Sequence, residues 1–457
     1  MKRFLNFHKN KIALFLALTF IINLTAQVSL KEQNSFNDRV FTPIDLLNYR
    51  RFDVIAKYIY AKAYLQNCTS TWPTEIYKEH LRVWGNFIER GFPPKKFPEK
   101  IGFQEHLNSF NTLLNDIKSH GFNSQKSLVP VGTKGLYNGA HRLAACLACN
   151  TLIMGYLVNH TGVYATAEFF RNKKNYVKTG LAEKYLDAMA LAYCALKKNT
   201  YIAILFPCAK NKRIEVKKIF NSYGHIVYQK NIFCHDRGLL NLILITYGEN
   251  HWLSNKKNNF ERARKNSQIR FCKKTSGYVN IYLLESDSLE NIKTCKDKIR
   301  SLFDIGTYSI HINDTYQETL TLAQAFFAHT SVIFLNNTHN KNFLNFNKLI
   351  SQLKTVCDYY KLDTNSICLV GNAPLCAYGL RDCNDLYIIC HDEKYYKYFS
   401  GKNKISGHQK YKKYYPVSID EIIYNPKYHF YYKNIKIATP EVIMQMKHRR
   451  KEKYVIN

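Results

Sequence analysis

A histidine and an arginine stand side by side at the expected start of a helix, directly after an Asn-Gly pair. The pair is Asn138-Gly139, and His141 and Arg142 follow Ala140, where an uninterrupted helical pattern begins. The first turn of a helix carries backbone N–H groups without partners inside the helix, and the helix dipole favours negative charge there. We therefore predict that Asn138, Gly139, His141 and Arg142 bind a phosphate or the phosphates of a nucleotide. The alternative is that His141 and Arg142 only cap and solvate the helix terminus.

Two short strands and a helix must hold this turn in place. Apolar residues at 128–131 predict a strand, which turns and resumes at residues 136–137. After the Asn-Gly turn, Leu143, Ala144 and Leu147 fall on one face of the expected helix. Upstream, residues 45–65 have helical spacing and are predicted to form one helix of an extension that leads into this unit.

The stretch NGAHRLAA, residues 138–145, resembles the G-x-H-R-x-x-A signature of the ParB/sulfiredoxin-like superfamily. An expected helix at residues 103–119 followed by the strand pair is the order of that superfamily, and the resemblance covers residues 75–160. It implies that the loop and the helix start bind nucleotide phosphates. Some members bind CTP and clamp DNA, some phosphorylate free serine, and sulfiredoxins repair an oxidised cysteine. Sulfiredoxins need a cysteine just before the histidine, and Ala140 stands there, which disfavours repair chemistry.

A second histidine, His311, is the candidate for covalent phosphoryl transfer. Residues 299–303, IRSLF, followed by SIHINDT at residues 309–315, resemble the end of nucleoside diphosphate kinase, in which a histidine carries the phosphoryl group. The resemblance implies His311 as phosphoacceptor and Arg300 as a phosphate-binding residue. Three positions depart from the family pattern: Phe206, Tyr308 and Ile312. The alternative is a strand histidine beside an Asp-Thr helix cap.

The segment around His311 alternates short strands with helices, which predicts an α/β sandwich of the ferredoxin-like kind. The elements expected there are strands at residues 201–206, 225–230, 239–247 and 278–284 and helices at residues 212–221 and 288–303.

The third chemical candidate is Asp385, on an expected strand at residues 382–389 that follows a Gly371-Asn372 turn and a helix at residues 373–380. This order resembles the nucleotidyltransferase superfamily, whose h-G-[GS] turn holds the triphosphate and whose D-x-D binds two metal ions. The resemblance implies Gly371 and Asn372 at the triphosphate, Asp385 as a catalytic and metal-binding residue, and magnesium with a nucleoside triphosphate as cofactor. The D-x-D reads Asp385-Leu386-Tyr387, however, and one carboxylate cannot supply the charge that two-metal transfer needs.

Length and composition set the framework for these candidates. A chain of 457 residues predicts about three domains, since domains usually have ~100–200 residues. We predict a hydrophobic leader at 1–27, a helical extension with a ParB-like domain at 28–170, a ferredoxin-like domain at 176–340 and a nucleotidyltransferase-like domain at 343–457. The fold class is α/β of the α+β kind.

Charge, thiols and the amino-terminal segment bear on partners and location. The net charge of +32 would attract nucleic acid, nucleotides or an anionic membrane surface. The 13 cysteines lack the spacing of a disulfide framework, which favours free thiols and a reducing compartment. Basic residues before an apolar run at 12–22 instead match a signal or anchor, which predicts membrane association through the amino-terminal segment. The alternative is a cytoplasmic protein.

These features together predict a nucleotide- or phosphate-binding protein, either a nucleotide-dependent transferase or a degenerate descendant of one. All three resemblances concern phosphate or nucleotide handling, and none keeps a complete catalytic set. The competing prediction is a nucleic-acid-binding or scaffold protein of ParB-like type without chemistry. No helix-turn-helix is evident after the ParB-like unit, which counts against sequence-specific DNA binding. The acceptor substrate is not identified by the sequence.

Overall fold

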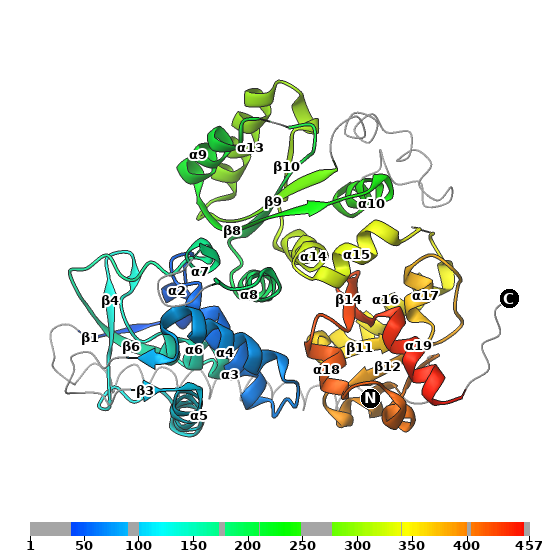
Figure 1. The fold of residues 1–457 in the computed structure, drawn as a ribbon, viewed down its shortest axis with the longest axis horizontal. Helices are drawn as coiled ribbons and strands as arrows, with labels where there is room; N and C mark the ends of the chain where they lie inside the picture. The colour runs from blue at the N-terminus through cyan, green and yellow to red at the C-terminus, as the bar shows by residue number, and fades with distance from the viewer. Residues whose placement is uncertain are drawn as a thin grey trace, which may run out of the picture.

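The chain folds into a mixed α and β structure in which helices pack on three larger sheets (Figure 1). This computed structural model describes residues 38–89, 100–172, 179–209, 211–247, 277–339, 341–399 and 404–451. The predicted α+β class is confirmed. The predicted leader at residues 1–27 lies outside the described residues. Within the described part of the chain, the helices are too short or too polar to cross a bilayer.

The first sheet carries the turn that was predicted to bind phosphate. Its strand order is β1-β6-β4-β5, and β4 runs parallel to β6 but antiparallel to β5. The strands are β1 (Asp38–Phe41), β4 (Val129–Gly132), β5 (Gly135–Leu136) and β6 (Ile153–Leu157). The helices beside them are α3 (Asp53–Leu65), α4 (Trp72–Gly85), α5 (Phe103–His120) and α6 (Ala140–Cys149) (Figure 1). The strand pair, α5 and the start of α6 at Ala140 agree with the sequence prediction.

The single helix predicted at residues 45–65 is wrong. A short helix α2 (Pro43–Leu46) ends at Leu47, whose backbone is extended, and α3 begins only at Asp53. Both pieces bury apolar side chains in the same core, so their spacing resembles one continuous helix. A small hairpin of β2 (Ile88–Glu89) and β3 (Lys100–Ile101) lies between α4 and α5 in the sequence.

The second sheet is antiparallel throughout and has the order β10-β7-β9-β8. Its strands are β7 (Thr200–Leu205), β8 (His225–Phe233), β9 (Tyr278–Glu285) and β10 (Ile310–Ile312). Helices α9 (Arg213–Tyr223) and α13 (Leu289–Phe303) cover one face, where they pack on Ala203 and Leu205. The opposite face, with Ile202 and Ile204, joins the core of the first unit.

The strand predicted at residues 239–247 is wrong, because this segment forms α10 (Asp236–Tyr247). Its run of apolar residues suits a buried strand or a buried helix equally well. In the structure, Leu239, Leu242 and Ile243 are buried at helical spacing, and the Asn241 amide donates to the Leu335 carbonyl at 2.6 Å. The long apolar run therefore packs as a helix on α15 (His329–Asn337).

The third sheet is mixed, with the order β13-β12-β11-β15-β14. Strand β11 is antiparallel to β12 and parallel to β15. The strands are β11 (Ile367–Val370), β12 (Leu386–Cys390), β13 (Ile405–Gly407), β14 (His429–Tyr432) and β15 (Ile435–Ala438). The helices are α16 (Leu344–Tyr359), α17 (Ala373–Ala377), α18 (Ile419–Tyr424) and α19 (Pro440–Arg449). Strand β12 begins at Leu386, so Asp385 precedes it and does not lie within it as predicted.

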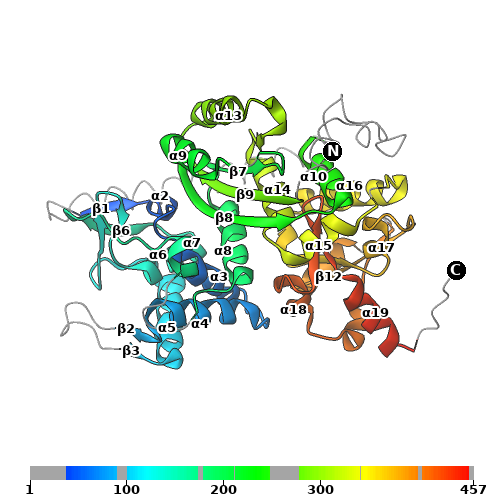
Figure 2. The ribbon, with the colours of Figure 1, turned by 45° about the horizontal axis from the view of Figure 1, so that its top comes forward.

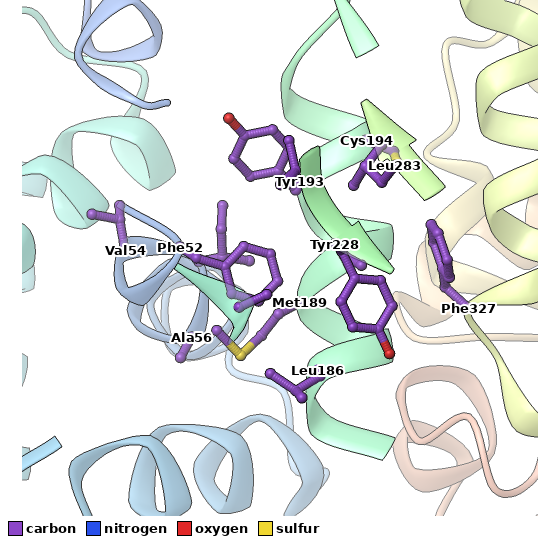
Figure 3. Packing of buried hydrophobic residues seen from close by; sticks show 14 of the residues in the cluster. Phe52, Val54, Ala56, Leu186, Met189, Tyr193, Cys194, Tyr228, Leu283 and Phe327 are labelled. Carbon is purple, nitrogen blue, oxygen red and sulfur yellow. The ribbon is translucent and has the colours of Figure 1, made fainter. Parts of the chain in front are cut away.

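One hydrophobic core joins the first unit to the inner face of the second sheet. Helix α8 (Glu183–Leu196) lies between α3 and β8 in both views of the ribbon (Figures 1 and 2). Figure 3 shows Phe52, Met189 and Tyr228 packed together at this junction, and the ring centroids of Phe52 and Tyr228 are 6.5 Å apart. The core continues through Phe327, whose ring lies 5.3 Å from Tyr228. The first two units are therefore held together by buried apolar surface.

Polar contacts join the third unit to the segment between α3 and α4. The Asp420 carboxylate accepts hydrogen bonds from the backbone and hydroxyl of Thr69 at 2.6 and 2.8 Å. The ring of His391 lies between Asp420, 2.8 Å from Nδ1, and the Gln66 carbonyl, 2.9 Å from Nε2. Ionisable groups thus contribute directly to this junction.

Candidate functional site

The turn before α6 has the backbone conformation that the sequence suggests. Gly139 has φ 100°, a left-handed value, and its N–H donates to Oδ1 of the exposed Asn138 at 2.7 Å. A Cβ at Gly139 would lie 2.8 Å from a methyl carbon of Val129, so both conformation and space favour glycine here. The tight approach lets α6 begin directly behind β4.

Part of the Arg142 guanidinium is used in hydrogen bonds within the protein. Its Nη1 donates to the Leu128 carbonyl at 2.8 Å and to the Ser127 hydroxyl. Burial lowers the pKa of Arg142. Within the described part of the chain, its Nε and Nη2 donate no hydrogen bond. The guanidinium therefore anchors the entry of β4 and keeps two donors for a further partner.

His141 is a neutral ring within the helix cluster. The Tyr77 hydroxyl lies 2.9 Å from its Nε2, and the Phe110 ring centroid is 4.8 Å away. Burial lowers the pKa of His141 well below 6.5, and the nearby Lys57 adds to that effect. His141 would therefore contribute a neutral ring, and not a positive charge, to an anion site.

A buried ion cluster supports this turn and was not predicted. Asp53 lies 2.8 Å from Arg51 Nε and 3.1 Å from Lys57 Nζ, and Arg51 also donates to the Leu136 carbonyl in β5 at 2.8 Å. Burial opposes the charge of Asp53, but Arg51 and Lys57 outweigh it and hold the pKa of that carboxyl far below its usual range. The alternation of basic and acidic residues at 51, 53 and 57 is the available sequence signal, and it resembles a solvated helix face.

Arg300 lies near enough to His311 to influence the pKa of its ring. Burial lowers the pKa of His311 to about 3, and Lys296 and Arg300 lower it further while Asp314 opposes them. Lys296 Nζ lies 2.9 Å from Asp314 Oδ1. Within the described residues, the buried Nε of Arg300 has no hydrogen-bond partner. A neutral imidazole beside two cations is compatible with attack on a phosphoryl group.

The third predicted site, around Gly371 and Asp385, contains the side chain of Tyr387. Gly371 has φ 66°, and a Cβ there would lie 2.9 Å from Tyr387 Cδ2. The Tyr387 hydroxyl donates to Asp385 Oδ2 at 2.8 Å. Asn372 begins α17 without a side-chain cap. The Tyr387 ring therefore fills the space beside Gly371 where the predicted triphosphate would approach.

The third predicted site offers a magnesium ion one carboxylate, Asp385. Within the described part of the chain, no three His, Cys, Asp or Glu side chains are grouped so as to hold a metal. Magnesium in proteins is usually held by one or two carboxylates together with substrate phosphates. Asp385 is a single carboxylate, and its Oδ2 already accepts a hydrogen bond from Tyr387.

A charged cavity of about 530 Å³ lies where α7 (Ala167–Asn172) and α8 meet α9, β8 and β9. Sequence reasoning missed it, because its side chains come from elements that are far apart in the chain. Its basic lining residues are Arg171, Lys184, Arg213, Lys217, Lys230 and His329, and its acidic ones are Glu168, Glu183 and Asp187. Basic side chains therefore outnumber acidic ones around the cavity.

Each acid in this cavity already has a cationic partner. Arg171 lies 2.6 Å from Glu168 and 2.7 Å from Glu183, and Lys230 lies 2.7 Å from Asp187. Within the described residues, Arg213 and Lys217 make no ion pair. Burial raises the pKa of Tyr282, and the nearby Arg213 opposes that rise. Two basic side chains beside the cavity thus remain available for an anion.

A buried hydroxyl links two of these acids. Tyr228 Oη lies 2.8 Å from Glu183 Oε2 and 2.8 Å from Asp187 Oδ1. The Tyr228 hydroxyl is therefore shared between the two carboxyl groups. Burial raises the pKa of Asp187. Burial also opposes the charge of Glu183, but Arg171, Tyr228 and Lys230 together lower the pKa of that carboxyl.

No protein-family model and no curated protein matches the chain. The cysteines of the described part are free, as their spacing predicts.

Proposed function

We propose that this chain is a nucleotide- or phosphate-binding protein, a nucleotide-dependent transferase or a degenerate descendant of one, whose phosphate site is the cavity beside α9. The observation that carries the proposal is the pair Arg213 and Lys217, which face a cavity whose acids are already matched by other cations. A volume of about 530 Å³ lies in the usual range for small-molecule sites. The site therefore suits a dianionic or more highly charged phosphate group.

The sheet topologies support the finer family assignments. In the second sheet, the order β10-β7-β9-β8, with α9 after β7 and α13 after β9, agrees with a ferredoxin-like arrangement into which α10 is inserted. In the third sheet, β11, α17 and an antiparallel β12 agree with a nucleotidyltransferase-like arrangement. The strands β4 and β5 followed by α6 agree with a ParB-like unit.

His311, which does not line that cavity, is a second proposed site, the phosphoacceptor for transferase chemistry. A ring nitrogen of the neutral imidazole would form a bond to the terminal phosphorus of a nucleoside triphosphate, and the bond to the bridging oxygen would break to release the diphosphate. Lys296 and Arg300 would attract the phosphoryl oxygens. The catalytic role proposed for Asp385 rests only on the resemblance to nucleotidyltransferases.

Nucleotide-dependent thermal stability tests the proposal. Full-length protein is heated with ATP, CTP, GTP, UTP or inorganic diphosphate, with and without magnesium. A ligand at 100 times its dissociation constant should stabilise the protein by about 2.7 kcal/mol. The double variant Arg213→Ala/Lys217→Ala should lose this response, while Lys218→Ala, an exposed change on the same helix, should keep it. A wild-type protein that responds to none of these anions would refute the proposal.

Membrane association through residues 1–27 is also a proposal, based on the basic flank and the apolar run. Deletion of residues 1–26 should release soluble protein that keeps its nucleotide response. Full-length protein that fractionates as freely soluble and uncleaved would contradict it. The competing nucleic-acid-binding function is favoured by a separate surface of the third unit.

A further inference from the structure

A basic and aromatic surface forms where the 3-10 helix η6 (Gln409–Tyr414) packs against the end of α19. Arg449 Nη1 donates to the Tyr415 carbonyl at 2.7 Å, and the Arg450 guanidinium carbon lies 3.7 Å from the Tyr411 ring centroid. We call this surface the η6–α19 face. It consists of Lys410, Tyr411, Lys412, Lys413, Tyr414, Lys447, Arg449 and Arg450.

The charge of the η6–α19 face has one sign. Residues 404–417 and 442–451 contain no aspartate or glutamate. Among the described residues, Glu393 reaches the face from outside and pairs with Lys412 at 3.3 Å. Lys410, Lys413 and Arg449 are exposed. Clustered cations without acids between them are the electrostatic footprint of a polyanion site.

An aromatic ring of the face holds the planar guanidinium of Arg450 in one orientation. Arg450 lies over Tyr411, and the buried ring of His408 contacts Tyr411 with centroids 4.4 Å apart, which fixes the tyrosine from below. Lys410 and Lys413 lie 5.0 and 5.1 Å from the rings of Tyr411 and Tyr414. A guanidinium plane held in this way can stack on a nucleobase that is not already stacked in a duplex.

We propose that the η6–α19 face binds single-stranded nucleic acid, with the lysines along the phosphate backbone and a base stacked on the Arg450 plane. The proposal is independent of the phosphate cavity beside α9, because none of its residues lines that cavity. A duplex or a membrane surface would use the charge but not the stacking plane. Loss of stacking at unchanged charge therefore distinguishes the single strand from these other polyanions.

Fluorescence anisotropy with the full-length protein tests the proposal. The probes are an oligothymidine and an oligouridine of about 15 nucleotides, which exceeds most single-domain site sizes, together with a duplex of equal length and anionic phosphatidylserine vesicles. Arg450→Lys, which keeps the charge and removes the plane, should weaken single-strand binding at least five-fold or so and leave duplex binding nearly unchanged. Lys410→Ala/Lys413→Ala should lower the salt dependence by about 0.7 per lost phosphate contact.

The control is Lys293→Ala/Lys298→Ala on α13, which removes two exposed lysines, one of them 5.0 Å from the Tyr223 ring. It should leave single-strand binding and its salt dependence unchanged. An equal loss in this control, or equal binding of single strand, duplex and vesicle that Arg450→Lys does not alter, would overturn the proposal. The variants of the η6–α19 face should keep the nucleotide-dependent thermal response, so this result is separable from that of the cavity.

Discussion

The hydroxyl of Tyr387 donates a hydrogen bond of 2.8 Å to the Asp385 carboxylate, so the two side chains are in direct contact. The tyrosine stands at the position where the resemblance to nucleotidyltransferases requires a second acid. The same ring packs against Gly371, so the missing acid and the filled turn have one cause. Both follow from the presence of a large ring at residue 387.

Replacement of Tyr387 by aspartate should create a magnesium response that the wild type lacks. The change removes the ring beside Gly371 and places a second carboxylate two residues from Asp385, where it can share an ion with a nucleotide's phosphates. The variant should lose basal stability, because the packing of the ring is lost. Thermal melting with each nucleotide and increasing magnesium measures both effects. Tyr387→Asn is the uncharged control, and a destabilised Tyr387→Asp protein without a metal response would contradict the prediction.

Gly371→Ala should destabilise the third unit by about 1–3 kcal/mol. The backbone at residue 371 has φ 66°, and the added Cβ would lie 2.9 Å from Tyr387 Cδ2. Urea unfolding measures the loss. In a Tyr387→Ala background the clash is absent and only the conformational cost of the left-handed backbone remains, so the same change should cost less there. An equal cost in both backgrounds would show that the ring does not contribute.

The sequence predicted those elements that have strong local signals. The strand pair β4 and β5, the turn at Asn138-Gly139 and the start of α6 at Ala140 were predicted correctly, because turn residues and apolar spacing act over a few residues. Segment 239–247 failed for the opposite reason: an apolar run has no period that separates a buried strand from a buried helix.

The sites were harder to predict than the elements, because the partners of their side chains are distant in sequence. The cavity brings Arg171, Arg213 and Lys230 together from three elements. The Ser127 and Leu128 contacts that hold Arg142 require the folded geometry. Arg300 and His311, which are close in sequence, lie near enough for the guanidinium to lower the pKa of the ring.

Tyr228→Phe should destabilise the junction between α8 and β8 by about 1–3 kcal/mol. The change removes the hydroxyl between Glu183 and Asp187, and leaves two carboxyl groups without their shared buried partner. Chemical unfolding followed by tryptophan fluorescence, to which Trp72 contributes from its stack on Tyr185 of α8, measures the loss. The matched control is Tyr282→Phe, since the Tyr282 hydroxyl makes no hydrogen bond to the described residues and lines the same cavity. Equal effects of the two changes would contradict the assigned role of the Tyr228 hydroxyl.

The contact between His391 and Asp420 should make the attachment of the third unit depend on pH. Burial opposes protonation of His391, but the hydrogen bonds to Asp420 and to the Gln66 carbonyl outweigh it and raise the pKa of His391 above 6.5. The stabilising contribution of His391 is therefore complete below about pH 6.5 and is lost as the pH rises through the raised pKa. Burial also opposes the charge of Asp420, but His391 and Thr69 lower the pKa of that carboxyl below 3.8. Its contribution is present above about pH 3.8 and is lost as the pH falls through the lowered pKa.

The two contributions overlap most fully between about pH 4 and pH 6.5. His391→Gln, which cannot be protonated, should therefore lower stability by about 1–3 kcal/mol near pH 5.5 and by much less above the raised pKa of His391. Thermal midpoints of wild type and variant across this range give the difference. The control is His120→Gln, because His120 also pairs with an acid, Asp116 at 3.2 Å, but its side chain is 73% exposed and the pair should contribute little at any pH. A His391→Gln effect that stays constant from pH 5 to pH 9 would show that the ring holds the junction as a neutral group, without the charge on which the pH dependence rests.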